Sequence, residues 1–347
     1  MRKTGVFALF PSASGLLLIF SLFGYLLLFP QNAAESARSG LLLWYHSVLP
    51  VIFPFLFLSS MMIRIIHAED IPKTLTRPFM WLFGCSPYGA FAILAGFLCG
   101  LPVGAKLTSE LYREKKIERS EALRLIGFVN NLSPGFLLSY VAVEQLQLNG
   151  FAWCVPVSVL GSALFCGLAE HIGNKHHPSL AWHPHKRENH ESFGELPLTA
   201  HVRKDSNLQN ASTVPESTFA DVLDECIFDA MESALRLCAY ILLFAVLSGA
   251  LMQAAPLSNP FVLLLVSSIE VTNGTRLLAQ SALPFHAKYL AISALAAFGG
   301  CSALAQSIGI AHMDREFLLR YIKSRVNITL LAILFAAAAL LLQNKLF

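Results

Sequence analysis

Two stretches of this chain share one pattern of interrupted apolar runs, and this pattern constrains the fold more than any other feature. They cover residues 94–136 and 264–306. Each has an apolar run, a Gly-containing break, a half-polar helical segment, a second apolar run and a second break rich in small residues. Gly104 and Gly274 lie 170 positions apart (274 − 104), and the same spacing relates the basic residues that follow them. Matching interrupted segments in two halves are typical of membrane transporters whose site lies at the breaks.

The composition is that of a protein embedded in a lipid bilayer. Hydrophobic residues make up 55% of the 347 residues and charged residues only 14%, well below the roughly 25% of soluble domains. Several apolar runs reach the ~20 residues that a helix needs to cross a bilayer. The net charge of +3 comes from basic residues in short loops, which is typical of cytoplasmic loops. We therefore predict an all-helical, multi-pass membrane protein whose partner is the bilayer and which binds no nucleic acid.

The apolar runs also predict the order of the membrane segments. A first span is expected at residues 16–29, although its basic start also fits a signal peptide, and a short polar loop is expected at 31–40. Further spans are expected at residues 41–65, 120–143, 151–172, 221–252, 288–310 and 328–342, of which 120–143 and 288–310 are broken.

Two shorter apolar segments, at residues 88–103 and 261–284, are expected to be re-entrant hairpins. The first lies between two basic loops, at 64–87 and after Gly104, and a hairpin keeps both loops on the cytoplasmic side. Backbone that is not helical at membrane depth is tolerated only where it is buried in protein or lines a wet cavity. Loop charges place the second hairpin on the opposite face, so we predict two inverted repeats.

This layout predicts four parts of the chain. They are an N-terminal helix and loop over residues 1–40, a first repeat over 41–172, a linker over 173–220 and a second repeat over 221–343. The linker is polar and rich in histidine, so we expect a largely disordered cytoplasmic tether. Its irregular histidine spacing and the seven unpatterned cysteines predict no metal site and no cofactor. The sequence leaves a homo-oligomer open.

Hairpin tips and broken spans place free helix ends inside the membrane, and these ends define the predicted substrate site. Helix N-termini favour anions, glycine lets backbone approach a ligand, and amides and hydroxyls offer hydrogen bonds. The alternative is that small and polar residues only hold helices together. The candidates are Gly100, Pro102, Gly104, Lys106, Asn130, Asn131, Ser133, Glu270, Thr272, Asn273, Gly274, Arg276, Gly300, Ser302 and Gln306.

Glu270 is the candidate with the most possible functional roles. It follows the apolar run Val-Leu-Leu-Leu-Val-Ser-Ser-Ile, and an ionisable group at membrane depth indicates function by default. It could bind a cation, carry a proton or hydrogen-bond a substrate. The alternative is a buried ion pair with Arg276 or Lys106.

Four segments together resemble the YlbJ-type sporulation integral membrane proteins, within the nucleoside-recognition or Gate-domain superfamily. They are Gly-Leu-Pro-Val-Gly-Ala-Lys at 100–106, Asn130-Asn131 with Pro134, Ile-Glu-Val-Thr-Asn-Gly at 269–274 and Phe-Gly-Gly-Cys-Ser at 298–302. The resemblance runs over about residues 41–342. It departs at Leu101, where that family tends to have an aromatic residue, at Val129, where it often has cysteine, and in the long linker.

The resemblance implies a role in endospore formation, in the mother-cell-derived outer membrane around the forespore. It implies transport of dipicolinate, a planar dianion, toward the spore. Helix N-termini with Lys106 and Arg276 would suit a dianion, and a protonated Glu270 would couple transport to protons. A nucleoside transporter and a non-transporting Gate-fold scaffold are the alternatives. Because no phosphate loop, nucleophile elbow or HExxH motif occurs, we expect no enzyme.

Overall fold

Helices form all the regular structure in the described part of the chain, as expected from the composition. The structure is a computed structural model that describes residues 12–65, 72–148, 150–175, 219–254, 258–311 and 314–346. The expectations for residues 1–11 and for most of the linker, 176–218, lie outside this part. Within it, the predicted hairpin at 261–284 and the predicted broken spans at 120–143 and 288–310 each contain helical segments separated by a break, whereas 88–103 holds one helix, Pro87–Cys99, and the first residue of the next, Val103.

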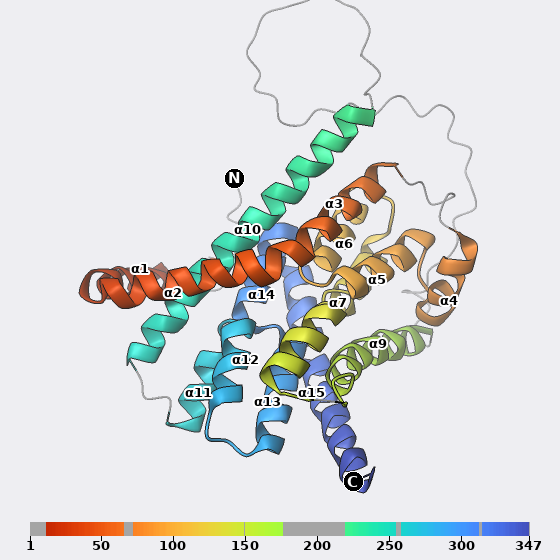
Figure 1. Ribbon diagram of the computed structural model, residues 1–347. Helices are drawn as coiled ribbons and strands as arrows, with labels where there is room; N and C mark the ends of the chain where they lie inside the picture. The colour runs from red at the N-terminus through yellow and green to blue at the C-terminus, as the bar shows by residue number, and fades with distance from the viewer. Residues whose placement is uncertain are drawn as a thin grey trace, which may run out of the picture.

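The two halves of the chain share a long helix, two short helices joined by a tip, an interrupted helix and a second long helix, in that order, and the first half has α4 as an additional helix before the two short ones (Figure 1). In the first half these are α2 (Pro30–Leu43), a π-helical segment η2 (Trp44–Val48), α3 (Leu49–Ile65), α4 (Lys73–Phe83), α5 (Pro87–Cys99), α6 (Val103–Arg113), α7 (Arg119–Phe128), α8 (Pro134–Phe136), η3 (Leu137–Gln145) and α9 (Cys154–Lys175), preceded by α1 (Ser12–Leu28). In the second half they are α10 (Phe219–Ala254), α11 (Pro260–Ser267), α12 (Val271–Gln280), α13 (Phe285–Phe298), α14 (Gly300–Ala311) and α15 (Arg315–Leu346).

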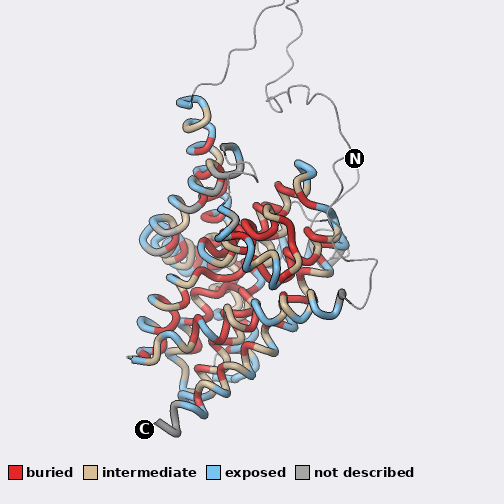
Figure 2. The backbone as a smooth tube through the Cα atoms, turned by 90° about the vertical axis from the view of Figure 1, so that its right-hand side faces the viewer, coloured by how far each residue is buried: buried red, intermediate tan, exposed pale blue. Residues whose placement is uncertain are grey.

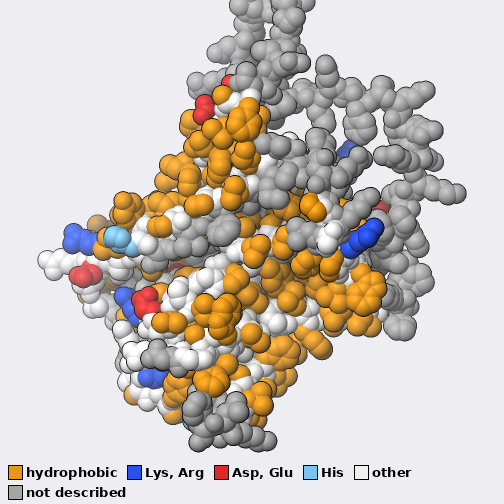
Figure 3. Space-filling model, turned by 45° about the vertical axis from the view of Figure 1, so that its right-hand side comes forward, with side chains coloured by type: hydrophobic (Ala, Val, Ile, Leu, Met, Phe, Trp, Pro, Cys, Tyr) orange, Lys and Arg blue, Asp and Glu red, His pale blue; other side chains and the backbone are white. Residues whose placement is uncertain are grey.

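Four of the described helices are long and apolar enough to cross a membrane, and a bent pair makes a fifth candidate. The four segments are Cys154–Gly173, Phe219–Gln253, Phe285–Ala311 and Arg315–Leu342, and the bent pair joins α4 to α5 at an angle of 100°. Hydrophobic side chains cover most of the face in Figure 3, with charged ones near its margins. Trp81 is 81% exposed and Phe261 80% exposed, an arrangement that suits contact with lipid.

The long helix of the first half packs antiparallel to its counterpart in the second half. At one end, the Asn32 side chain donates to Gln253 at 3.0 Å. At the other end, Arg64 forms ion pairs with Glu225 and Asp229. Residue numbers therefore rise along α2–η2–α3 as they fall along α10, and α10 packs against both α2 and α3.

The last helices of the two halves, α9 and α15, pack in the same antiparallel way. The rings of Phe165 and Phe335 lie with their centroids 6.2 Å apart, and Arg320 contacts Glu170 at 2.9 Å. Two reciprocal contacts complete the pattern, since α7 packs on α15 while α13 packs on α9, and α6 packs on α14 while α12 packs on η3. The tips and breaks thus meet between the two halves; buried residues concentrate in the middle of the molecule (Figure 2).

Close approach of backbones explains the glycines at the hairpins. A Cβ atom on Gly104 would meet the backbone of Val129 and Asn130, and one on Gly100 would meet Ser133. In the second half, a Cβ on Gly274 would meet the carbonyl oxygen of Ser267. Glycine has no Cβ atom, and its absence allows the backbone of the first hairpin to lie directly against the backbone of the first break.

The structure differs from the sequence expectations in three places. Residues 31–40, expected to be a loop, belong to helix α2, whose Gly40 is buried against Ala245 of α10. The expected loop 64–87 contains helix α4, whose first half is mostly polar and whose second half is apolar and aromatic. Arg315, Arg320, Lys323 and Arg325 follow the second broken span, and their charge predicts a cytoplasmic segment before the last span, but they belong to the long helix α15, inside which Arg325 is 2% exposed. In each case packing against a distant helix decides the outcome, and local composition does not report such packing.

Candidate functional site

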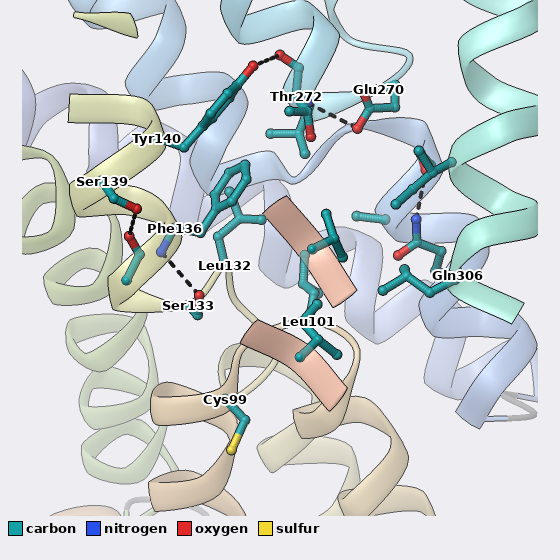
Figure 4. A pocket seen from close by; sticks show the side chains of 18 of the residues that line it. Cys99, Leu101, Leu132, Ser133, Phe136, Ser139, Tyr140, Glu270, Thr272 and Gln306 are labelled. Carbon is teal, nitrogen blue, oxygen red and sulfur yellow. Dashed lines mark hydrogen bonds between the residues drawn. The ribbon is translucent and has the colours of Figure 1, made fainter. Parts of the chain in front are cut away.

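A cavity of about 450 Å³ lies where both hairpin tips meet both broken helices. Figure 4 shows its labelled side chains around a central space, with Phe136 and Tyr140 on one side and Gln306 on the other. The residues that line it come from both halves of the chain, including η2, α3 and α10. They are Val48, Ile52, Cys99, Leu101, Leu132, Ser133, Gly135, Phe136, Leu138, Ser139, Tyr140, Glu144, Leu237, Ile241, Glu270, Val271, Thr272, Ser302, Ala303 and Gln306.

Glu270 forms the part of the wall that belongs to the second hairpin tip. Its side chain is 3% exposed and accepts hydrogen bonds from the backbone N–H groups of Thr272 at 3.0 Å and Asn273 at 2.7 Å. A carboxylate at this position satisfies N–H groups that helix α12 leaves unpaired and complements its dipole. In the described part of the chain, no ion pair joins Glu270 to Arg276 or Lys106, so its partner is the helix end.

The first break supplies the aromatic wall. Ser133 caps helix α8, since its hydroxyl accepts from the backbone N–H of Phe136 at 3.2 Å. The rings of Phe136 and Tyr140, one helical turn apart, stack with centroids 5.0 Å apart. The Tyr140 hydroxyl then donates to the carbonyl oxygen of Thr272 at 2.9 Å. This bond joins the first broken helix directly to the second hairpin across the cavity.

The start of α14 supplies the amide wall and is held by the second hairpin. The backbone N–H groups of Cys301 and Ser302 donate to the carbonyl oxygens of Ser268 at 2.8 Å and Ile269 at 2.9 Å. The Gln306 amide donates to the Ser302 hydroxyl at 2.8 Å. The second hairpin and the second break therefore form one hydrogen-bonded unit.

The charges around the cavity are negative. Among its described lining residues the ionisable side chains near neutral pH are Glu270, which is buried, and Glu144, which is exposed. Lys106 instead donates to Ser233 of α10 at 3.1 Å and lies 3.9 Å from Glu110. Arg276 is exposed and donates to Asn273. The two predicted cations thus lie outside the cavity lining.

Five of the fifteen predicted site residues line the cavity, and ten lie outside its lining. The five are Ser133, Glu270, Thr272, Ser302 and Gln306. The ten have other places: Gly100, Pro102, Gly104 and Gly300 are buried at the tips and breaks, Asn130 and Asn131 are buried behind the first break, Gly274 is buried in α12, and Lys106, Asn273 and Arg276 are less buried.

Sequence reasoning missed all fifteen of the other lining residues. Phe136, Tyr140 and Glu144 recur at every fourth position of the first broken span, and this one-sided spacing was a usable signal. Lining residues such as Cys99, Leu132 and Leu237 carry no such signal, because a leucine facing a cavity has the same sequence pattern as one facing lipid.

Comparison with known proteins identifies a protein of similar sequence. The chain matches no protein-family model and no solved structure. It is 27% identical over 300 residues to the sporulation integral membrane protein YlbJ of Bacillus subtilis (strain 168), and the match covers 81% of this chain and 71% of the relative. Together with the membrane-spanning helices, this similarity shows that the chain is a multi-pass integral membrane protein and a homologue of the sporulation protein YlbJ.

Proposed function

We propose that the protein is a transporter that moves a small metabolite across a forespore membrane during sporulation, with dipicolinate as the first candidate substrate. The proposed activity moves a molecule without changing it, so it requires no catalytic residue. The cavity would be the substrate site, and one group of helices would rock against the other to expose it to each side in turn.

The packing of equivalent helices supports an inverted relation between the two halves. A helix that lies antiparallel beside its own counterpart is related to it by a two-fold axis perpendicular to both helices. Both long pairs, α3 with α10 and α9 with α15, have this relation, and the cross-contacts between halves are reciprocal. For helices that cross a membrane, such an axis lies in the membrane plane, which is the symmetry of inverted-repeat transporters.

The single observation that carries the proposal is the position of the cavity. It is bounded by both hairpin tips and both helix breaks, so its walls come from the backbone segments that membrane proteins tolerate only around a wet or occupied space. A volume of about 450 Å³ lies within the range of roughly 300–1,000 Å³ of small-molecule pockets. If the protein were a scaffold that binds no ligand, the meeting of the helix breaks of both halves around one cavity would have no explanation.

The acidic residues of the lining require a change of charge before dipicolinate can bind. A dianion beside an ionised Glu270 would be repelled at short range, and at membrane depth this repulsion is weakly screened. Protonation of Glu270 removes the repulsion and turns the carboxyl group into a hydrogen-bond donor. Dipicolinate entry would then be accompanied by a proton and would depend on the pH gradient.

A nucleoside is the second candidate, and the uncharged polar lining favours it. Ser133, Thr272, Ser302 and Gln306 offer hydroxyl and amide groups, and Phe136 and Tyr140 offer an aromatic face. A nucleoside has a flat base and several hydroxyl groups but no charge. It would enter without any change at Glu270.

Uptake into proteoliposomes tests the proposal. Purified protein would be reconstituted and supplied with labelled dipicolinate or uridine, with and without a pH gradient. We expect dipicolinate uptake that rises with an inward proton gradient. Uridine uptake that is insensitive to the gradient would favour the second candidate, and uptake of neither would favour a non-transporting scaffold.

A cavity variant and a matched control connect uptake to the site. Gln306→Leu keeps the size of the side chain but removes its amide from the lining. Gln280→Leu makes the same change at an exposed position at the end of α12. We expect Gln306→Leu to lower uptake about tenfold, the effect of one buried hydrogen bond to a charged substrate, and Gln280→Leu to leave it unchanged. Equal rates for the two variants would contradict a substrate site in this cavity.

A further inference from the structure

Arg325 lies in the middle of the membrane-spanning helix α15, yet its side chain is bound to both broken helices. It is 2% exposed. Its guanidinium group donates to the carbonyl oxygen of Gly127 at 3.1 Å, to that of Ala297 at 3.4 Å and to the side-chain oxygen of Asn131 at 3.1 Å. Within the described residues, no acidic side chain forms an ion pair with it.

The two carbonyl groups occupy equivalent places in the two repeats. Gly127 and Ala297 lie 170 positions apart (297 − 127), the spacing that relates the halves, and each belongs to the last turn of a helix that stops inside the protein, α7 or α13. Carbonyl groups of a last turn have no partner within their own helix. One guanidinium group therefore satisfies the interrupted ends of both broken helices.

The charges explain why a cation is stable there without a carboxylate. Each helix C-terminus carries about half a negative charge, so two such ends together match the single positive charge of Arg325. The face of the Tyr321 ring, whose centroid lies 5.4 Å from the guanidinium carbon, adds a further favourable contact. Lysine could supply the charge but not the planar fork of donors that reaches three acceptors at once.

Only one such residue serves both repeats. The position equivalent to Arg325 in the first half is Val155 (325 − 170), a buried aliphatic residue of α9. A single donor group therefore binds the equivalent carbonyl groups of both halves, as expected for a residue that lies near the axis relating the halves.

We propose that Arg325 is a positioning residue that fixes the interrupted ends of α7 and α13 to each other and so holds the two breaks in register around the cavity. This inference rests on the proposed function, because the residues after these breaks, Ser133 and Ser302, line the substrate cavity. If the breaks separate, the cavity walls separate with them. Arg325 itself does not line the cavity and acts through the helices it joins.

Transport kinetics of three variants test the role. Arg325→Lys keeps the charge but loses the fork, Arg325→Gln loses both, and Arg320→Gln removes a cation five positions away on the same helix. Per folded molecule, we expect Arg325→Lys to raise the KM of uptake about tenfold, the effect of one lost charged hydrogen bond, and Arg320→Gln to leave KM unchanged. A role in folding alone would lower the amount of active protein and leave KM unchanged.

A second readout does not depend on transport. Cys99 is a buried cysteine that lines the cavity, whereas Cys301 is exposed. Loosening of the breaks should raise the alkylation rate of Cys99 relative to Cys301, measured peptide by peptide with mass spectrometry, by about tenfold in Arg325→Lys. Arg325→Gln should show at least the same increase; if it does not fold, Arg325→Lys alone decides the result.

The outcomes separate the two proposals. A wild-type KM and a wild-type Cys99 rate in Arg325→Lys would overturn the positioning role, whatever the protein transports. If the wild-type protein takes up neither dipicolinate nor uridine, the proposed function fails, while the Cys99 rate still tests whether Arg325 holds the breaks together.

Discussion

In the second hairpin, the helix after the tip is capped by Glu270, a residue of the tip itself, whereas in the first hairpin the cap comes from another segment. The position equivalent to Glu270 in the first hairpin is Gly100 (270 − 170), which has no side chain to offer. There, the Ala105 N–H donates to the side-chain oxygen of Asn130, in the first break, at 3.2 Å.

The chemistry of the two caps decides what each one connects. The two carboxyl oxygens of Glu270 accept hydrogen bonds from N–H groups of α12, so Glu270 caps one helix end. A carboxamide also donates, and the Asn130 amide group donates to Ser307 of α14 at 2.7 Å and to Tyr321 of α15 at 2.9 Å. The cap of the first hairpin therefore connects it through Asn130 to the second half of the protein, whereas the Glu270 cap stays within its own half and the second hairpin is joined to the first half by the Tyr140 hydroxyl, at the Thr272 carbonyl.

The largest effect on stability should come from Asn130→Ala. Asn130 is fully buried, and its loss leaves the Ala105 N–H without an acceptor and removes the amide that donates to both the Ser307 and the Tyr321 hydroxyls, which keep only their contact with each other. Buried groups left unpaired cost about 1–3 kcal/mol each, so we expect a loss of about 3 kcal/mol. Thermal unfolding of the purified protein in detergent would measure it.

Asn273→Ala is the matched control for that substitution. Asn273 is half-buried, and its side-chain oxygen accepts only from the exposed Arg276. Its replacement should change stability by less than about 0.5 kcal/mol. Similar melting temperatures for the two alanine variants would show that Asn130 does not join the halves.

Glu270→Ala should have the second-largest effect on stability. The hydrogen bonds that it removes all lie within the second half of the chain. Two N–H groups of α12 lose their acceptor, which costs about 2 kcal/mol for a buried cap. Glu270→Gln keeps one acceptor oxygen and should cost about half as much. In proteoliposomes Glu270→Gln should also remove the dependence of dipicolinate uptake on the pH gradient.

Glu144→Gln separates capping from charge at the cavity. Glu144 also lines the cavity but is exposed and caps no helix. We expect its melting temperature to match that of the wild-type protein. A loss of stability equal to that of Glu270→Gln would mean that cavity charge, and not the cap, accounts for the effect.

Periodicity and repeat spacing predicted most of the fold, because both act over short stretches of sequence. An apolar run and a glycine at a break are both visible in the local sequence, so the all-helical fold and the places where helices are interrupted could be predicted, whereas the 100° bend between α4 and α5 was not. Helix α2 could not be predicted in this way, because its polar composition indicates a loop and its stability comes from contact with α10.

The candidate site was predicted less completely, because a polar residue at a break can have either of two roles. Ser133 and Asn131 are nearly adjacent and both buried in a polar break, yet Ser133 lines the cavity while Asn131 accepts a hydrogen bond from Arg325. Which side of the break a residue faces depends on the backbone path after the helix ends. Spacing along the sequence does not record that path.

A third prediction concerns two equivalent glycines and has a smaller effect. In Gly104→Ala the new methyl group would push against the backbone of Val129 and Asn130 in the first break, whereas in Gly274→Ala it would push against the backbone of Ser267 in the same hairpin and, in α13, only against the end of the Leu295 side chain. Overpacking of this kind costs about 1–2 kcal/mol. Both variants should melt at lower temperature, but only Gly104→Ala should also raise the alkylation rate of Cys99, because it separates the first hairpin from its break. Gly161→Ala, where the methyl group meets only Phe335 at ordinary contact distance, should match the wild type.

The smallest effect should come from the two equivalent cations, Lys106 and Arg276. If a dianion were held by these side chains, Lys106→Ala and Arg276→Ala would both abolish dipicolinate uptake. Neither residue lines the cavity: Arg276 is exposed, and Lys106 is hydrogen-bonded to Ser233. We therefore expect Arg276→Ala to change uptake less than twofold and stability by less than about 0.5 kcal/mol, and Lys106→Ala to cost somewhat more because one buried bond is lost. Membrane levels of each variant, measured alongside uptake, keep the result interpretable. If either variant reaches wild-type levels in the membrane but takes up no dipicolinate, the substrate is bound by cations outside this cavity. Protonation of Glu270 would then play no part in balancing the charge of dipicolinate.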